Sequence, residues 1–193
     1  MRAFETEKTE VAEIDRSVYD IKDKVNAAFE VNSGLTAEIV EQISKEKHDP
    51  DWMREFRLKA LDIYNKASIP NWGPSLEGLD MRNIVTYVRP NTEMRGKWSE
   101  VPDDIKNTFE RLGIPQAERS SLAGVGAQYD SEVVYHNVKE EVAAQGVVYT
   151  DMESALTGPY ADMVKEHFMK CVPPTDHKFA ALHGAVWSGG SFV

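Results

Sequence analysis

The sequence predicts an α+β fold, in which a mainly helical domain leads into β structure. Apolar side chains recur at helical spacing over 50–66 and again over 102–112. A β-rich run covers 84–88, and residues 185–193 have the pattern of two short strands around a glycine turn. With 193 residues, 41% of them hydrophobic, the chain can form one domain with a core, alone or with a tail.

Composition excludes several classes of function. The formal net charge is −10, and no segment forms a basic stripe, so nucleic-acid binding is not expected. No stretch approaches the ~20 continuous apolar residues of a membrane helix, and the N-terminal MRAFETEKTE lacks the apolar centre of a secretory signal. The lone Cys171 cannot form an internal disulfide, which is typical of a reducing compartment. We therefore expect a cytoplasmic protein that binds neither nucleic acid nor membrane.

Residues 1–34 are predicted to form a charged N-terminal arm. Val18, Ile21 and Val25 have a weak helical spacing, and the Asn-Ser-Gly sequence at 32–34 breaks the pattern. We expect this arm to be flexible and to become ordered when a partner binds.

Two helices are predicted next. Thr36 can cap a short helix that carries apolar side chains over 39–43 on one face. Asp49 can cap a longer helix with Pro50 as its first residue, because the missing N–H of proline is not needed there. This helix is predicted to run to about Lys66. Three basic residues within it are interpreted as a solvated face: Arg54, Arg57 and Lys59.

The middle of the chain alternates between loops and short elements. Residues 68–80 are predicted to be a loop, and 84–88 favours a strand that Pro90 stops or confines to a sheet edge. A helix is expected from Pro102, closed by a left-handed Gly113. The remaining predicted elements are a strand at 132–136, a helix at 138–145, a strand at 147–149, a helix capped by Asp151, and a last helical pattern through Met163, His167 and Lys170.

The end of the chain is predicted to be a hairpin. Its parts are a strand at 185–187, a tight turn at 188–190 and a strand at 191–193. Because the second strand has only three residues, this hairpin lacks a full partner. We therefore expect the natural polypeptide to continue beyond Val193.

The glycine pair of Gly124-Val125-Gly126 is the first motif that could carry chemistry. A dinucleotide-binding loop needs a third glycine where Tyr129 stands, and it must follow a strand and open a helix. No GxxxxGK[ST] phosphate loop is present in the sequence, so ATP hydrolysis by this chain is not expected. We interpret the pair as a backbone turn that requires positive φ.

A second constellation surrounds the single cysteine. His167 and Cys171 are four residues apart, so imidazole and thiolate could face one metal on a helix, with Asp176, His177 and His183 following. A Pro-Pro pair ends that helix, however, and the histidines form no matched pair. His167 could also act as the base for a cysteine nucleophile, but the apolar neighbours of Cys171 would raise the thiol pKa. We expect structural or surface histidines and a buried, inert thiol, and we assign no catalytic, cofactor-binding or metal-binding residue.

The four tryptophans are a third candidate feature. Base-stacking platforms in nucleic-acid binders accompany a cationic groove, and none is predicted in this chain. We expect these residues to be core or interface anchors. They are Trp52, Trp72, Trp98 and Trp187.

Several collinear segments resemble the SufB/SufD family of iron–sulfur cluster assembly proteins, and its SufB branch in particular. The most specific is SLAGVGAQYDSEVVYHNVKEE at 121–141. The resemblance runs from about Asp15 to the last residue of the sequence. The other matching segments are HDPDWM at 48–53, FRLKALDIY at 56–64, NIVTYVRP at 83–90, VPDDIKNTFERLGIP at 101–115, GVVYTDMESAL at 146–156 and VPPTDHKFAALHGAVWSGGSFV at 172–193.

The resemblance implies a fold and a set of partners. SufB-like proteins have a largely helical N-terminal region, then a right-handed parallel β-helix, then a helical segment that docks the ATPase SufC. They pair with SufD, receive sulfur from a cysteine desulfurase and sulfur-transfer proteins, and pass nascent clusters to apo-proteins. The expected organisation is therefore an arm at 1–34, a mainly helical domain at 35–171, and at 172–193 the entry into a β-helix that is truncated here.

The same resemblance implies that this chain carries out no cluster chemistry of its own. The sulfur-accepting cysteine, the cluster ligands and the ATPase-docking helices of the family match no position here, and Cys171 does not align with the ligands. Iron–sulfur clusters are held by several clustered thiolates, so one thiol cannot hold the transient cluster of the full-length protein. We expect an N-terminal fragment of a scaffold subunit, without enzymatic activity or a cofactor of its own.

Two other hypotheses belong to different functional classes. The chain could be a standalone interaction module that binds a desulfurase-type partner through the exposed face of the 50–66 helix and the charged arm. It could also be a small thiol or metal enzyme that uses Cys171 and His167. The collinear segments favour the scaffold over both.

Overall fold

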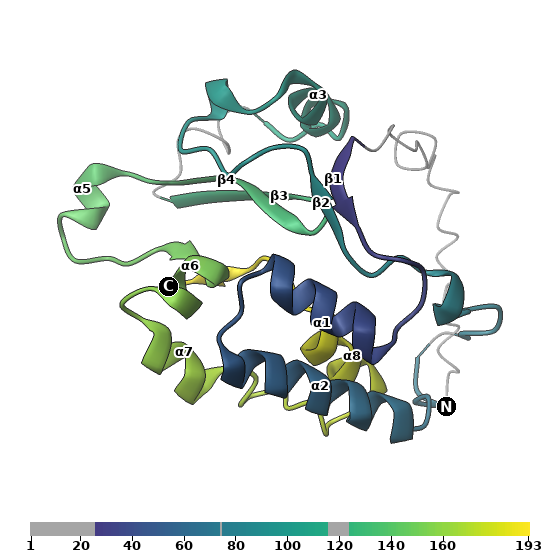
Figure 1. Cartoon of the computed structure of the whole chain (residues 1–193). Coiled ribbons are helices and arrows are strands. Elements are labelled where there is room, and N and C mark those ends of the chain that lie inside the picture. Colours follow the sequence, from purple (N-terminus) through teal and green to yellow (C-terminus); the bar gives the residue numbers. More distant parts are fainter. Residues whose placement is uncertain (1–25, 74, 116–123) are drawn as a thin grey trace, which may run out of the picture.

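The structure is a computed structural model that describes residues 26–73, 75–115 and 124–193. It combines helices with short antiparallel ribbons, which confirms the α+β prediction (Figure 1). The α-helices are α1 (Ala37–Glu46), α2 (Asp51–Lys66), α3 (Asp103–Arg111), α5 (Glu140–Ala143), α6 (Met152–Thr157), α7 (Ala161–His167) and α8 (Lys178–Val186). The strands are β1 (Ala27–Glu30), β2 (Val88–Pro90), β3 (Gly124–Tyr129), β4 (Glu132–Val138), β5 (Thr150–Asp151) and β6 (Ser191–Phe192), and two 3₁₀ turns cover Met81–Asn83 and Trp98–Glu100.

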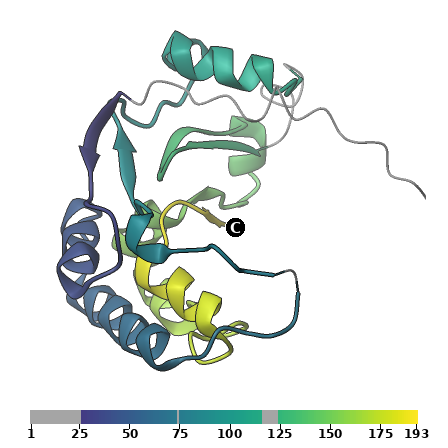
Figure 2. The same cartoon turned by 90° about the vertical axis from the view of Figure 1, so that its right-hand side faces the viewer.

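Helices α1, α2 and α8 form the helical part of the molecule (Figures 1 and 2). The hydroxyl of Thr36 accepts from the backbone N–H of Ile39 at 3.4 Å, which confirms the predicted cap of α1. The core between the three helices is built from Val40, Ala60, Leu61, Tyr64, Ala181 and Ala185. Its small members let α2 and α8 approach closely, since a Cβ added at Gly184 would lie 3.0 Å from that of Ala60.

Helix α8 replaces the predicted strand at 185–187, and that prediction was wrong. The ring Nδ1 of His177 caps the helix by accepting from the backbone N–H groups of Phe179 and Ala180. The small apolar residues Ala181 and Ala185 stand four positions apart and both pack on α2, which is a helical spacing. Val186 and Trp187 favour a strand locally, but the packing of Ala181 and Ala185 on α2 decides the conformation: Val186 is the last residue of the helix and Trp187 caps it.

The β1–β2 ribbon connects the helical part to the other half of the molecule (Figure 2). Phe29 pairs with Arg89 and Glu30 with Val88 in an antiparallel register. The predicted strand at 84–88 is displaced, because only Val88–Pro90 is a strand and Pro90 forms its end. The preceding backbone still pairs locally, with the N–H of Val31 donating to the carbonyl of Tyr87.

The antiparallel β3–β4 ribbon and α3 form the other half. Val101, which precedes α3, and Ile105 within α3 pack with Val134 and Tyr135 of β4, and Trp98 packs against this cluster. Helix α3 ends as predicted, with Gly113 following it at φ +73. The predicted helix at 138–145 is limited to the single turn of α5.

The last ribbon joins β5 to β6. Thr150 pairs with Phe192 and Asp151 with Ser191. The predicted terminal hairpin was therefore wrong: residues 191–192 pair with β5, which lies one residue beyond the strand predicted at 147–149. Asp151 caps α6 as predicted, accepting from the N–H of Ser154 at 2.9 Å.

Several predictions fall outside these observations or are corrected by them. The helical spacing at Val18, Ile21 and Val25 lies outside the described residues, and the domain boundaries and the parallel β-helix stay predictions. Trp187 is buried, whereas Trp72 is 65% exposed and is not a core residue. Among the described residues, no helix combines the length and the apolar character that crossing a bilayer requires.

Candidate functional site

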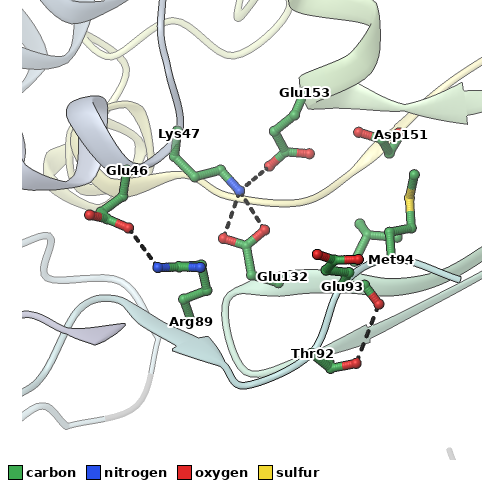
Figure 3. A pocket seen from close by; sticks show the side chains of 10 residues that line it. Glu46, Lys47, Arg89, Thr92, Glu93, Met94, Glu132, Asp151 and Glu153 are labelled. Carbon is green, nitrogen blue, oxygen red and sulfur yellow. Dashed lines mark hydrogen bonds and ion pairs between the residues drawn. The ribbon is translucent and has the colours of Figure 1, made fainter. Parts of the chain in front are cut away.

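The most distinctive polar feature of the molecule is a buried lysine at the end of α1. Lys47 is the C-terminal capping residue of that helix, and its side chain is only 3% exposed. Its Nζ lies 2.8 Å from a carboxylate oxygen of Glu132 in β4 and 2.8 Å from one of Glu153 in α6 (Figure 3). A buried ammonium group is tolerated only when it is paired, and here two carboxylates from distant segments pair it.

The network around Lys47 extends to two further segments. The hydroxyl of Tyr87, just before β2, donates to Glu132. Burial, together with this bond to a carboxylate, raises the pKa of Tyr87 far above its usual value, so the phenol stays protonated. Glu153 also accepts from the backbone N–H of Gly189 at 2.6 Å. One lysine therefore links α1, β2, β4, α6 and the turn before β6.

An open cavity of about 310 Å³ lies beside this network. It holds five carboxylates and two cations, and Arg89 pairs with Glu46 at 3.2 Å (Figure 3). The lining residues are Glu46, Lys47, Arg89, Thr92, Glu93, Met94, Glu132, Val133, Asp151 and Glu153. Across the described residues, no group of three or more His, Cys, Asp or Glu side chains is arranged to hold a metal ion.

A second buried cation lies on α2. Arg57 is fully buried, and its Nε donates to Asp49 at 2.6 Å. Its Nη1 donates to the backbone carbonyl of Trp187 at 2.9 Å, and its guanidinium lies over the Trp187 ring at 4.7 Å from the centroid. The interpretation of Arg57 as part of a solvated face was wrong, whereas Arg54 does lie at the surface.

Asp49 therefore has another role than the predicted one. Helix α2 begins at Asp51, and Pro50 takes the capping position without a side-chain hydrogen bond. The carboxylate of Asp49 turns inward and pairs with Arg57. A charged partner eight residues away competes with the local cap and is preferred, because an unpaired guanidinium in the core would cost several kcal/mol.

The two buried cations act on the same stretch of chain. Arg57 binds backbone carbonyls at the end of α8, and Lys47 holds Glu153, which binds Gly189. Gly189 and Gly190 have φ values of +69 and +110, which suit glycine. The arrangement therefore positions the approach to β6.

The structure does not bring together the residues that sequence analysis considered for metal or thiol chemistry. Helix α7 ends at His167, and Met169 has φ +49, so Cys171 does not follow one helical turn later. Cys171 is exposed, which contradicts the predicted buried thiol. His177 caps α8, and His183 lies within that helix.

The Gly124 and Gly126 pair has a packing role, not the predicted turn. Both residues lie in β3, and neither has a positive φ. The ring of Tyr149 lies against them: a Cβ added at Gly124 would fall 2.6 Å from its Cδ1. The glycines allow the aromatic ring to approach the ribbon, where it also packs against the tilted ring of His136 at a centroid distance of 4.6 Å.

Sequence analysis missed the residues of both buried networks. One signal was available for Arg57, which stands four residues after Met53 and four before Leu61 and so lies on the apolar stripe of α2. No comparable signal was available for Lys47, because its partners Glu132 and Glu153 are distant in sequence.

Comparison with known proteins identifies relatives. No family model matches the chain. Over 175 residues, or 91% of this chain, it is 51% identical to a Bacillus subtilis protein named iron-sulfur cluster assembly protein SufB. The chain is a homologue of the SufBD family. This confirms the resemblance seen in the sequence motifs.

Two further SufBD relatives give the same result. A Staphylococcus haemolyticus protein is 48% identical over 175 residues, and a Mycobacterium bovis protein is 44% identical over 189 residues, or 97% of this chain. Both are named iron-sulfur cluster assembly SufBD family proteins. The chain spans 37% of the length of the Bacillus and Staphylococcus relatives and 22% of the Mycobacterium relative.

Proposed function

We propose that this chain supplies the N-terminal, mainly helical region of a SufB-type scaffold. The scaffold assembles nascent iron–sulfur clusters with the ATPase SufC and with SufD, and passes them to apo-proteins. The observation that carries the proposal is the 51% identity over 91% of the chain to a protein named for iron–sulfur cluster assembly.

Within such a scaffold, the role of this region is to hold the chain that enters the next domain. Arg57 binds the backbone of Ala185 and Trp187, and Lys47 holds Glu153, which binds Gly189, so the two cations fix the segment from Ala185 to Gly189. In the proposed protein, the strand after this segment begins a right-handed parallel β-helix. The cluster-building groups belong to that later part, and sulfur reaches it from a cysteine desulfurase system.

The single thiol also supports the proposal that this region has a structural role and that another part of the protein builds the cluster. Cys171 is exposed, and the chain has no second cysteine. Because iron–sulfur clusters need several thiolates or equivalent ligands in one place, this region acts as a non-enzymatic support without a cofactor of its own. A free exposed thiol suits a reducing compartment, so we place the protein in the cytoplasm.

A chimera tests the proposal. The matched segment of the Bacillus subtilis protein is replaced by this chain, and the chimera is expressed in cells depleted of the native protein. We expect it to restore the activity of iron–sulfur enzymes and to co-purify SufC and SufD. A chimera that is folded and expressed at the native level but restores no such activity would overturn the proposal.

The same cells test the alternative of a standalone module. The 193-residue chain is expressed alone with an affinity tag, next to the chimera. The scaffold proposal expects the short chain to restore no activity. Rescue by the short chain alone would favour the interaction-module hypothesis.

A further inference from the structure

A groove lies between the loop that follows α2 and the segment that leads into α8. Its volume is about 460 Å³. Its lining consists of residues 67–72, residues 174–178 and Ile63, so it is separate from the cavity beside Lys47. We call it the Trp72 groove.

The groove presents an aromatic ring to solvent. Trp72 is 65% exposed, although tryptophan is on average a highly buried residue. Its ring meets the ring of His177 edge to face, at a centroid distance of 5.4 Å. His177 is itself held in place, because its Nδ1 accepts from the backbone N–H groups of Phe179 and Ala180. The indole is therefore positioned against a fixed imidazole, while much of its surface stays accessible.

The groove also presents a carboxylate. Asp176 lies just before the capping residue of α8, and its side chain is 58% exposed. Its Oδ2 lies 3.8 Å from Nε2 of His177, which is beyond hydrogen-bond distance. Across residues 26–73, 75–115 and 124–193, no lysine or arginine pairs with this carboxylate.

The lysine that lines the groove is engaged elsewhere. Nζ of Lys178 donates to the backbone carbonyls of Tyr64 at 2.7 Å and Ala67 at 3.0 Å. These carbonyls lie at the C-terminal end of α2, where the helix dipole favours a positive charge. The ammonium group also lies over the Tyr64 ring, 4.1 Å from its centroid. The charge that remains available in the groove is therefore the negative charge of Asp176.

A buried site in the same molecule shows which cation suits a ring and a carboxylate. The guanidinium of Arg57 lies over the ring of Trp187 at 4.7 Å, and its Nε donates to the carboxylate of Asp49 at 2.6 Å. A guanidinium can do both because its planar face stacks on an aromatic ring while its N–H groups bind a carboxylate. The Trp72 groove offers the same two groups, and both lie next to His177.

We propose that the Trp72 groove binds an arginine side chain of a partner polypeptide. The guanidinium lies on the exposed ring of Trp72 and donates to the carboxylate of Asp176. The charge of the whole chain favours the same kind of partner, because a formal net charge of −10 attracts basic surfaces. This inference is independent of the proposed function, since it uses only the groups of this groove.

The test uses two small probes that differ in charge. They are N-acetylarginine amide and N-acetylcitrulline amide, in which a neutral urea replaces the guanidinium. Each is titrated into the isotope-labelled 193-residue chain, and NMR spectroscopy follows the indole N–H signal of Trp72, identified by its loss in Trp72→Phe. We expect the arginine probe to bind about fivefold more tightly than the citrulline probe.

Asp176→Asn removes the charge and nearly keeps the shape of the side chain. We expect it to weaken binding of the arginine probe about fivefold and to leave binding of the citrulline probe unchanged. The matched control is Asp162→Asn, which removes an exposed carboxylate from the first turn of α7, outside the groove. This control should leave the affinities for both probes unchanged.

A second variant keeps the test usable if Asp176→Asn does not fold. Trp72→Leu removes the ring from an exposed loop position, and its titrations are followed through the backbone amide of Asp176. We expect this variant to bind the arginine probe about fivefold more weakly than the parent chain does.

Three results would overturn the proposal. The first is equal affinity of the parent chain for the two probes, and the second is an effect of Asp162→Asn as large as that of Asp176→Asn. The third is tighter binding of N-acetylleucine amide than of the arginine probe, because the groove would then select an apolar side chain.

The titration with the arginine probe is repeated on the chimera. The same shift of the Trp72 signal there would support a groove that is open to a partner in the longer protein. A folded chimera whose Trp72 signal does not respond to the probe would refute the binding of a partner at this site.

Discussion

Two buried cations show how single residues decide the local structure. Arg57 and Lys47 are both removed from water, which is costly unless every charge is matched. Arg57 pairs with the carboxylate of Asp49 and donates to the backbone carbonyl of Ala185. Lys47 pairs with Glu153, which in turn accepts from the backbone N–H of Gly189. At this scale the charges act as positioning groups, because they hold the backbone of residues 185–189.

Removing the guanidinium should destabilise the fold strongly. Arg57→Met leaves the Asp49 carboxylate buried and unpaired, so we expect the free energy of unfolding to fall by about 3–5 kcal/mol. Chemical denaturation monitored by tryptophan fluorescence measures this. The control is Arg54→Met on the same helix, whose exposed pair with Glu41 should contribute at most about 1 kcal/mol. Equal losses in the two variants would contradict the role of Arg57.

His136 should make stability depend on pH. Burial lowers its pKa below the ordinary 6.5, although the nearby Asp151 carboxylate favours the protonated form. The unfolded chain therefore binds the proton at a higher pH than the folded chain does. The stabilising contribution is complete above pH 6.5 and is lost as the pH falls through that value toward the folded-state pKa.

The variant that tests this is His136→Phe, which keeps a ring next to Tyr149. Denaturant midpoints are measured between pH 7.5 and pH 5. We expect the variant to lose less stability than the parent over this range. A parent and a variant with the same pH dependence would show that His136 does not contribute.

At the scale of elements, Lys47 joins pieces that contact each other little otherwise. Strand β4 and helix α6 come from separate parts of the sequence, and a carboxylate from each pairs with the ammonium group of Lys47 at the end of α1. The turn before β6 is attached to the same group through Glu153. Loss of this link should loosen the β5–β6 ribbon before it affects α2 and α8.

Hydrogen exchange can show whether the β5–β6 ribbon loses protection before α2 and α8 do. In Lys47→Met, we expect the amide of Gly189 and the β5–β6 ribbon to lose protection, and the global stability to fall by about 2–3 kcal/mol because the two carboxylates are partly solvated. The matched variant is Lys45→Met, at an exposed position of the same helix. Uniform loss of protection across α2, α8 and the ribbon would argue against a local role of Lys47.

Whether a sequence prediction was confirmed depended on how far apart along the sequence the interacting residues lie. The Thr36 and Asp151 caps and the Gly113 helix end were predictable, because each depends on neighbours within four residues. The strand predicted at 185–187 and the cap predicted at Asp49 were wrong, because distant partners on α2 override the local preference. The cavity beside Lys47 could not be predicted, since its pairs join residues about 85 and 106 positions apart.

At the scale of the whole molecule, we propose that the chain is a support for the part of a SufB-type scaffold that builds clusters. Its helical layer and its β3–β4 half are joined by the β1–β2 ribbon, and the described end of the chain lies between them (Figure 2). The buried charges fix the approach to that end, and Cys171, the only cysteine of the sequence, is exposed and takes part in neither network. The chain spans 37% of the length of the Bacillus subtilis relative.

The central claim is that this region carries no cluster of its own. The most direct test is anaerobic reconstitution of the purified 193-residue chain with iron and sulfide, followed by desalting with a chelator and absorbance spectroscopy. The account predicts no stable visible band for the parent chain and the same spectrum for Cys171→Ser. A stoichiometric, chelator-resistant band that the Cys171→Ser variant lacks would contradict it.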